Sequence, residues 1–218
     1  MASLETSIIF GGESFTATSD GVLLHAASGN LFVSDCHFGK TTHFRKNALP
    51  IPEQAMKKDF MRLEDVVKRL NPNRIVFLGD LFHSRENREW DMLSEFLYTR
   101  INRPLTLVLG NHDILNKQAY ERAGMTLAHE FILGKIHFVH EHAHDKQHSA
   151  FVVSGHIHPG YRLKGAGKQQ MLLPCFYFGK HHAIMPAFGS LTGLSEVEKL
   201  HKADKVYCFT PDKIFVVD

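Results

Sequence analysis

Short apolar runs that end in polar side chains recur along this sequence. Leu105–Leu109 is too short to form a stable helix, and it breaks at Gly110 before Asn111, His112 and Asp113. Leu31–Ser34 is followed by Asp35 and His37, and Ile75–Leu78 is followed by Asp80. Ile136–Val139 is followed by His140, and Phe151–Ser154 is followed by His156 and His158. Ligands of open α/β sheets bind at the carboxyl ends of the strands, so we expect these five ends to meet at one site.

The first half of the chain alternates strands with helices. Short runs separated by glycine-containing turns predict an antiparallel start over Ser7–Phe10, Ser14–Thr18 and Val22–His25. Apolar residues spaced by three and four predict helices over Glu53–Leu70, residues 88–101 and Asn116–Ala123. Because strands lie between these helices, right-handed parallel crossovers are the default connection.

The second half of the chain consists of strands and turns. The predicted strands are Thr126–Leu133, Lys135–Val139, Ala150–Ser154, Met171–Phe178 and Ala183–Ala187, with a closing hairpin of Val206–Thr210 and Lys213–Val217. No repeat or linker interrupts the sequence, so we expect residues 1–218 to form a single domain. An α/β half followed by a β-rich half is most simply two sheets packed face to face with helices outside.

Composition narrows the class of protein further. The 218 residues are 44% hydrophobic and 22% charged, as in ordinary soluble globular proteins, and a net charge of +2 neither requires nor excludes nucleic acid as a partner. Three widely spaced cysteines favour neither a disulfide framework nor a cysteine zinc site, and they fit a reduced, cytoplasmic compartment. We find no export signal and no membrane-spanning segment. The anomaly is histidine, with 16 residues, many of them directly after the apolar runs.

Two of the strand ends carry paired metal-competent side chains. On an extended strand end, Asp35 and His37 point the same way, as do His156 and His158, so each pair can clamp one ion. Taken singly, such motifs are more often turns or exposed loop histidines. Their joint occurrence at the ends of successive strands is what favours a metal site.

Three further residues complete the inventory of donors. Asp80 offers two carboxylate oxygens and can serve two ions, Asn111 offers an amide oxygen, and His140 offers an imidazole nitrogen. Mixed oxygen and nitrogen donors without thiolates suit manganese, iron or zinc. Two such ions roughly 3.5–4 Å apart activate water and clamp both reacting oxygens of a displacement at phosphorus.

The order of these motifs resembles that of the calcineurin-like metallophosphoesterase superfamily. The shared elements are Asp-x-His, Gly-Asp, Gly-Asn-His-Asp, a single His and Gly-His-x-His, and they cover nearly the whole chain. The resemblance implies an α/β fold, the four-layer αββα sandwich, with a two-metal phosphoesterase centre. It assigns the first metal to Asp35, His37 and His158, the second to Asn111, His140 and His156, and the bridge between them to Asp80.

The resemblance also implies two residues that act without binding metal. His112 is expected near the scissile phosphate, where it stabilises charge and protonates the leaving oxygen. Asp113 is expected to orient the His112 ring, a role that carboxylates often have around a metal centre. These two residues complete the expected catalytic set.

A narrower resemblance surrounds the first motif. Val33–Lys40, followed by Phe44–Lys46 and Leu49–Pro52, is similar to the ligase-associated metallophosphoesterases, a bacterial family of DNA damage response endonucleases (PdeM). The family implies a phosphodiester substrate, in DNA, and association with a DNA ligase and a helicase. Lys40 and Arg45 lie just after the first ligand pair, where they either bind a substrate phosphate or belong to a solvated loop.

Three functions are compatible with the sequence. The leading hypothesis is a two-metal phosphodiesterase with nuclease character, in which a metal-bridging hydroxide attacks phosphorus and His112 assists the leaving group. A phosphomonoesterase or nucleotide phosphatase is the second, since the metal centre alone does not distinguish diesters from monoesters. A non-catalytic scaffold is the third, and it is disfavoured because every ligand motif is present.

Overall fold

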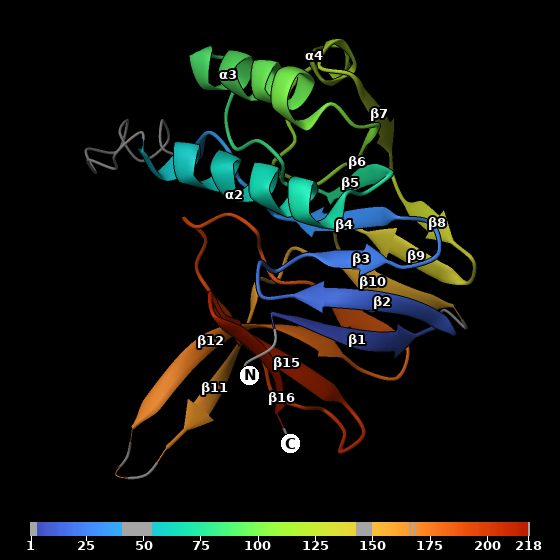
Figure 1. Cartoon of the computed structure of the whole chain (residues 1–218), viewed down its shortest axis with the longest axis vertical. Coiled ribbons are helices and arrows are strands. Elements are labelled where there is room, and N and C mark those ends of the chain that lie inside the picture. Colours follow the sequence, from blue (N-terminus) through green and yellow to red (C-terminus); the bar gives the residue numbers. More distant parts are fainter. Residues whose placement is uncertain (1–3, 41–53, 143–149, 166, 168, 218) are drawn as a thin grey trace.

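The computed structural model describes residues 4–40, 54–142, 150–165, 167 and 169–217. Two β-sheets form its framework, with helices on one side (Figure 1). The first sheet has seven strands in chain order: β1 (Glu5–Phe10), β2 (Glu13–Thr18), β3 (Leu23–His25), β4 (Asn30–Ser34), β5 (Arg74–Leu78), β6 (Leu105–Val108) and β7 (Met125–Ala128). β1 to β4 pair antiparallel, and β4 to β7 pair parallel, so the first sheet carries both the antiparallel start and the parallel crossovers that the sequence predicts.

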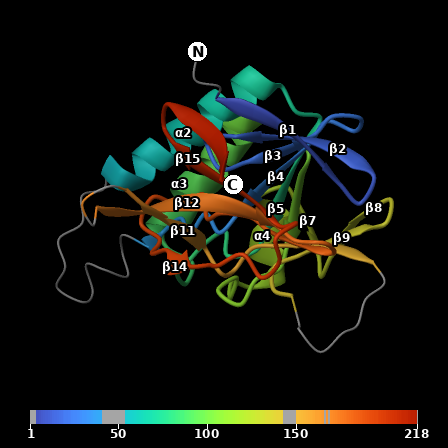
Figure 2. The same ribbon diagram turned by 90° about the horizontal axis from the view of Figure 1, so that it is seen from below.

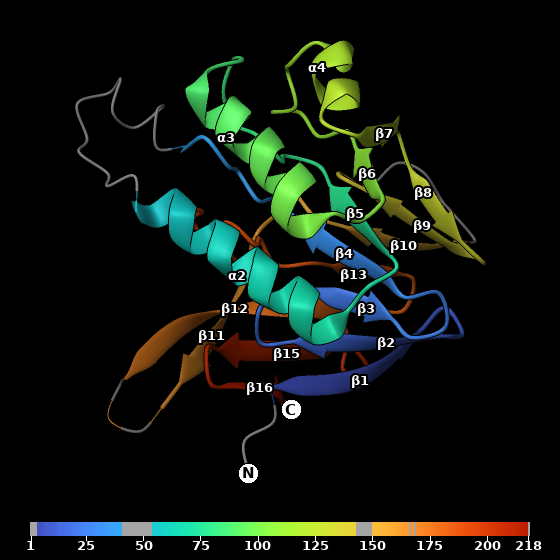
Figure 3. The same cartoon turned by 45° about the horizontal axis from the view of Figure 1, so that its top comes forward.

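The second sheet is built from the rest of the chain. Its strands are β8 (Phe131–Leu133), β9 (Ile136–Val139), β10 (Phe151–Ser154), β11 (Pro159–Lys164), β12 (Gln170–Phe178), β13 (His182–Ile184), β14 (Ser195–Glu196), β15 (Lys205–Thr210) and β16 (Lys213–Val217). β9 pairs with β10 and β10 with β13, all parallel. The end of the β11–β12 hairpin, part of the second sheet, extends beyond the other strands (Figures 1 and 3).

In the described part of the chain, three helices cover one face of the first sheet. α2 (Gln54–Leu70) and α3 (Arg88–Phe96) lie side by side on it, and α4 (Lys117–Arg122) lies beyond them (Figure 3). α3 begins at Asn87, whose side chain accepts N–H bonds from Glu89 and Trp90, and it continues into a π-helical turn over Leu97–Ile101. The predicted apolar stripe of α2 is buried against the sheet, with Met56, Phe60, Leu63 and Val67 in the core.

A second core fills the space between the two sheets. Phe32 of β4 stacks on Phe138 of β9 with ring centroids 3.8 Å apart, and Phe15 contacts both rings edge-on or tilted. Seen from below, β12 and β15 lie on the side of the first sheet opposite the helices (Figure 2). The α/β sandwich expected from the sequence is therefore present. Within the described residues, however, no helix follows α4, and a smaller cluster around Cys175 and Cys208 forms the outer face of the second sheet.

The predicted strands differ from those of the structure at two places. The run Thr126–Leu133 was expected to be one strand, but β7 and β8 belong to different sheets, and the chain crosses between them at His129 and Glu130. β11 was not predicted, because Pro159 and Gly160 at its start are residues that strands usually avoid. This strand follows His158 directly and connects the last polar strand end to the protruding hairpin.

Candidate metal centre

The five polar strand ends meet at one place in the structure, as expected. Five of the residues just beyond β4, β5 and β10 have left-handed backbone conformations: Asp35 (φ 51°), His37 (φ 48°), Asp80 (φ 51°), His156 (φ 66°) and His158 (φ 53°). Left-handed backbone costs a non-glycine residue about 1–2 kcal/mol, and such strain concentrates at functional sites. The pairing of Asp35 with His37 on an extended strand end is therefore wrong in its geometry, since β4 ends at Ser34 and the turn that follows brings the two side chains together.

Asp35, His37 and His158 form the first donor cluster. Their potential ligand atoms all lie within 4.8 Å of one another. His158 Nε2 is 3.3 Å from both His37 Nε2 and Asp35 Oδ1. Two atoms bound to one ion by bonds of about 2.1 Å stand roughly 3.0–3.4 Å apart, so this spacing suits a shared cation.

Asp80, His140 and His156, together with Asn111, form the second donor cluster. His140 Nε2 lies 2.9 Å from Asn111 Oδ1, 3.1 Å from His156 Nδ1 and 3.4 Å from Asp80 Oδ1. The other nitrogen of the same ring, His140 Nδ1, is 3.0 Å from the Leu78 carbonyl oxygen. A ring that donates its Nδ1 proton to a carbonyl directs the Nε2 lone pair inward, as a metal ligand requires.

Asp80 lies between the two clusters. Its Oδ1 faces His140 of the second donor cluster, and its Oδ2 is 3.7 Å from His37 Nε2 of the first. Oδ1 also accepts the His112 N–H at 2.9 Å, which fixes the orientation of the carboxylate. This buried carboxylate can thus reach a cation in either cluster.

The electrostatics of the first donor cluster fit a divalent cation. Asp35 Oδ1 is fully buried and has no hydrogen-bond partner of normal geometry among the described residues, whereas Oδ2 is 2.5 Å from Ser34 Oγ and 2.9 Å from the His156 N–H. Burial by itself raises the pKa of Asp35, but the neighbouring His158 and His140 rings and the Ser34 hydroxyl lower it overall. Burial lowers the pKa of His37 to about 3, which leaves its ring neutral. An ionised carboxylate beside the neutral His37 imidazole is the protonation state in which these two groups bind metal.

Two glycines let the chain approach these donors closely. A methyl group added to Gly155 would lie 1.9 Å from Ser34 Oγ and 2.4 Å from Asp35 Oδ2. Gly79 has a φ of 73°, and a methyl group there would lie 2.2 Å from His140 Nδ1. Because real atoms never come so close, the Gly-Asp and Gly-His-x-His motifs need glycine for steric reasons.

His112 lies at the edge of the centre and is partly exposed. Its ring centroid is 5.7 Å from that of His37 and 4.1 Å from that of His83. His83 was missed by the sequence analysis, although it follows Asp80 by only three residues. Its Nδ1 is 3.2 Å from His37 Nδ1, so it contacts both a donor and the His112 ring.

The hydrogen bonds of Asp113 differ from its expected role, which was to orient the His112 ring. Its Oδ2 accepts N–H bonds from Asp80 (2.8 Å) and Gly110 (2.9 Å), and its Oδ1 accepts them from Leu81 (3.0 Å) and Phe82 (3.4 Å). Both oxygens are thus occupied by the backbone of the β5 and β6 ends. Asp113 holds together the two turns that carry Asp80 and Asn111.

Of the two residues expected to bind a substrate phosphate, Lys40 belongs to the described part of the chain and Arg45 does not. Lys40 lines the same small pocket as His37. Burial lowers the pKa of Lys40, and the Asp80 carboxylate opposes that effect. Arg45 lies outside the described residues.

Among the helices of the described chain, none is both long and apolar enough to span a membrane.

Comparisons with known proteins identify the family and the fold of the chain. A model of the calcineurin-like phosphoesterase family matches residues 31–166. The structure of the nuclease MPE from Pseudomonas putida has a TM-score of 0.78 and 21% sequence identity, covering 98% of this chain and 100% of its own, and so shows the same fold. A phosphoesterase from E. coli, Yfce, has a TM-score of 0.43 and 14% identity over 85% of this chain and 90% of its own. Among curated proteins, none matches the chain.

Proposed function

Because this chain belongs to the calcineurin-like phosphoesterase family, and is thus a metal-dependent phosphoester hydrolase, we propose that it is a two-metal phosphodiesterase that cleaves DNA. The observation that carries the proposal is the pair of donor clusters on either side of Asp80. Two adjacent cations are the arrangement suited to in-line displacement at phosphorus.

The proposed ligands follow the two clusters. Asp35, His37 and His158 would hold one ion, Asn111, His140 and His156 would hold the other, and Asp80 would contact both. The donor set contains oxygen and nitrogen but no sulfur, which favours manganese, with iron or zinc as alternatives. When bound, such ions neutralise the phosphate and lower the pKa of a bound water.

In this proposal His112 acts on the leaving oxygen. Its backbone N–H is fixed by Asp80 Oδ1 and its ring packs on His83, so the imidazole is held beside the donors while part of it remains exposed. An imidazole in that position can donate a proton to the alkoxide as it leaves. Asp113 serves as a positioning residue, since it binds the backbone of the turns on either side of Asp80 and Asn111 rather than any reacting group.

Lys40 would bind a non-bridging phosphate oxygen. The proposal is supported by the shared pocket lining of Lys40 and His37, because a lysine beside the metal ligands would add a point charge for phosphate. The sequence assigns the same role to Arg45. Both residues would lower KM for a charged substrate more than they raise turnover.

DNA as substrate is the finer part of the proposal. It rests on two supports, the sequence similarity around Val33–Lys40 and the name of the Pseudomonas putida protein of the same fold, which is a nuclease. The same similarity leads us to propose a cytoplasmic role in DNA repair, beside a ligase and a helicase. We take residues 1–218 as one domain, because both sheets contribute donors.

The first experiment compares manganese-dependent hydrolysis of bis(p-nitrophenyl) phosphate and p-nitrophenyl phosphate. Metal-stripped protein and His112→Ala are measured alongside, with His137→Ala, a strand histidine outside the centre, as the matched control. We expect a clear preference for the diester, lost in the first two samples and kept in the control. Circular and single-stranded DNA are then assayed for cleavage under the same conditions.

The second candidate function is a phosphomonoesterase, because the metal centre does not select between esters. A preference for the monoester would overturn the nuclease proposal and leave the two-metal assignment standing. Manganese binding without turnover of either ester or of DNA would contradict both.

A further inference from the structure

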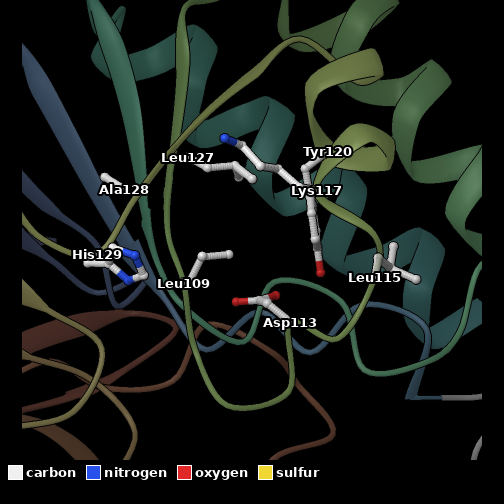
Figure 4. A pocket seen from close by; sticks show the side chains of 8 residues that line it. All are labelled: Leu109, Asp113, Leu115, Lys117, Tyr120, Leu127, Ala128 and His129. Carbon is white, nitrogen blue, oxygen red and sulfur yellow. The ribbon is translucent and has the colours of Figure 1, made fainter.

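The two donor clusters are supported from different parts of the molecule. Asp113, which holds the turns of the second donor cluster, lies in the wall of a pocket of about 210 Å³ beside α4 (Figure 4). The described lining of this pocket includes no residue of the first donor cluster. That cluster is contacted instead by the connecting segment (residues 185–194), which joins β13 to β14.

The connecting segment runs along the backbone of the first donor cluster. Gly189 donates its N–H to the Asp35 carbonyl at 3.1 Å, and Ser195, directly after the segment, donates its N–H to the His158 carbonyl at 3.0 Å. A methyl group added to Gly189 would lie 2.3 Å from the Cys36 carbonyl oxygen, so the two backbones are in direct contact. One stretch of chain thus holds two of the three donors of this cluster, both of which have left-handed backbone.

Asp59 of α2 holds the middle of the connecting segment. Its Oδ2 accepts two hydrogen bonds from Ser190, one from the N–H at 3.1 Å and one from the hydroxyl at 2.9 Å. Its Oδ1 is 3.5 Å from Arg62 Nη2, and the Arg62 guanidinium lies over the Phe188 ring and donates to the Phe188 carbonyl. Asp59 and Phe188 are both buried. Because a buried carboxylate is costly without hydrogen-bond donors, these contacts favour one position of the segment.

We propose that Asp59 is a positioning residue for the first metal site. Among the described residues it bonds to Ser190 and Arg62 and to no metal donor, so it acts on geometry and not on the metal directly. By fixing Ser190 it fixes the neighbouring Gly189, whose N–H holds the Asp35 carbonyl and so helps to set the direction of the Asp35 carboxylate. The inference rests on the two-metal assignment of the proposed function.

A purely structural role makes a different prediction. If Asp59 served only to fasten α2 to the core, its loss would lower the stability of the fold and weaken both metal sites alike. The described hydrogen bonds of the connecting segment reach Asp35 but neither Asn111 nor His140 of the second donor cluster. A positioning role therefore weakens the first site selectively.

Manganese titration, followed by electron paramagnetic resonance of the free ion, tests the proposal without any turnover. Two backgrounds separate the sites: His156→Ala removes a donor of the second cluster, and His158→Ala removes a donor of the first. In the His156→Ala background, Asp59→Ala should weaken the remaining first site roughly three- to tenfold, the effect of one net hydrogen bond. In the His158→Ala background, it should change the affinity by less than about twofold.

Ser190→Ala shows whether Asp59 acts through the connecting segment. It removes the hydroxyl but keeps the N–H, so it should weaken the first site by less than Asp59→Ala does. The double variant should lose no more affinity than Asp59→Ala alone, because both changes break the same contact. Asp65→Ala, at an exposed aspartate of the same helix, is the control and should leave both sites unchanged.

The outcomes separate this inference from the proposed function. Fewer than two manganese ions on the unaltered protein would overturn the two-metal assignment itself. Two bound ions, with Asp59→Ala weakening both sites equally or neither, would overturn the positioning role alone, as would additive losses in the double variant. Thermal unfolding checks that each variant folds. If Asp59→Ala does not, Ser190→Ala in the same two backgrounds decides the question by the same criterion.

Discussion

The two donor clusters use the same side-chain chemistry but are held in place by different kinds of support. In the second donor cluster, Asp113 accepts backbone N–H bonds from the ends of both β5 and β6, and the Leu78 carbonyl fixes the His140 ring. In the first, Asp35 Oδ2 receives the Ser34 hydroxyl and one backbone N–H, while Oδ1 faces His158 Nε2 at 3.3 Å and receives no backbone N–H among the described residues.

This difference indicates where each cluster is sensitive. The second donor cluster depends on a single partly buried carboxylate, that of Asp113, which joins two turns, so one substitution can displace two donors at once. The first donor cluster depends on several smaller contacts, including the Gly189 N–H on the Asp35 carbonyl at 3.1 Å, so the loss of one leaves others. The following predictions test that contrast, beginning with the residue that the clusters share.

Asp80→Asn should have the largest effect, because it removes the carboxylate that faces both clusters. We expect turnover of bis(p-nitrophenyl) phosphate to fall on the order of 10³-fold or more, since the lost group acts on charge in the transition state. Asp65→Asn, an exposed aspartate on α2, is the control and should be unaffected. Full turnover by Asp80→Asn would exclude a shared carboxylate and make the clusters independent.

Asp113→Asn should be next, and it should weaken the second donor cluster more than the first, which it reaches only through Asp80. An amide placed against four backbone N–H groups puts a donor where an acceptor is needed, which displaces the turns carrying Asp80 and Asn111. Removing such supporting groups typically costs about 10- to 100-fold in metal affinity. Manganese titration should show a larger loss of affinity at one of the two sites than at the other.

The matched control for Asp113→Asn is Asp204→Asn, because Asp204 also accepts a backbone N–H, that of His201, but contacts Tyr177 and none of the donors. Equal loss of metal affinity in both variants would mean that general destabilisation, and not the support of the second cluster, explains the effect.

Ser34→Ala should have a smaller effect and should act on the first donor cluster. The Asp35 carboxylate loses the hydroxyl but keeps the His156 N–H. A net hydrogen bond of about 0.5–1.5 kcal/mol corresponds to a roughly two- to tenfold weaker manganese site. If this variant loses more affinity than Asp113→Asn, the contrast between the clusters is reversed.

Lys40→Met should have the smallest effect, because it touches neither cluster's donors. We expect KM for the diester to rise by a few-fold, which is about the effect of losing one surface charge contact, while kcat stays nearly unchanged. Steady-state kinetics at two salt concentrations measures this, with Lys205→Met as an exposed lysine outside the centre. A fall in kcat with constant KM would place Lys40 in the chemical step instead.

Most of the fold could be predicted because the buried apolar residues recur in the sequence with the period of a strand or a helix. The strands that end at the centre and the helix Gln54–Leu70 follow directly from apolar spacing. The change of sheet at His129 has no such trace, since β7 and β8 are both ordinary apolar runs and only their partners differ. β11 was hidden by its proline and glycine, which are tolerated beside the short edge strand β14.

At the candidate centre, the sequence predicted which residues would meet but not how they are oriented. The left-handed turns at Asp35 and His158 depend on contacts between sheets, which local propensity does not contain. Asp113 was expected to face His112 because the two are adjacent in sequence, whereas its oxygens bind a neighbouring strand end thirty-odd residues away. His83 was missed because its role depends on the same packing.

The close approach of the chain at Gly155 and Gly79 limits how this protein can vary. In a saturation-mutagenesis map read by activity, both positions should be as intolerant as the histidines, although neither carries a functional group. An alanine scan would give a misleading result at these two positions, because alanine adds a methyl group there and removes no functional group. Engineering a new metal preference must therefore start from the donors and leave these two positions unchanged.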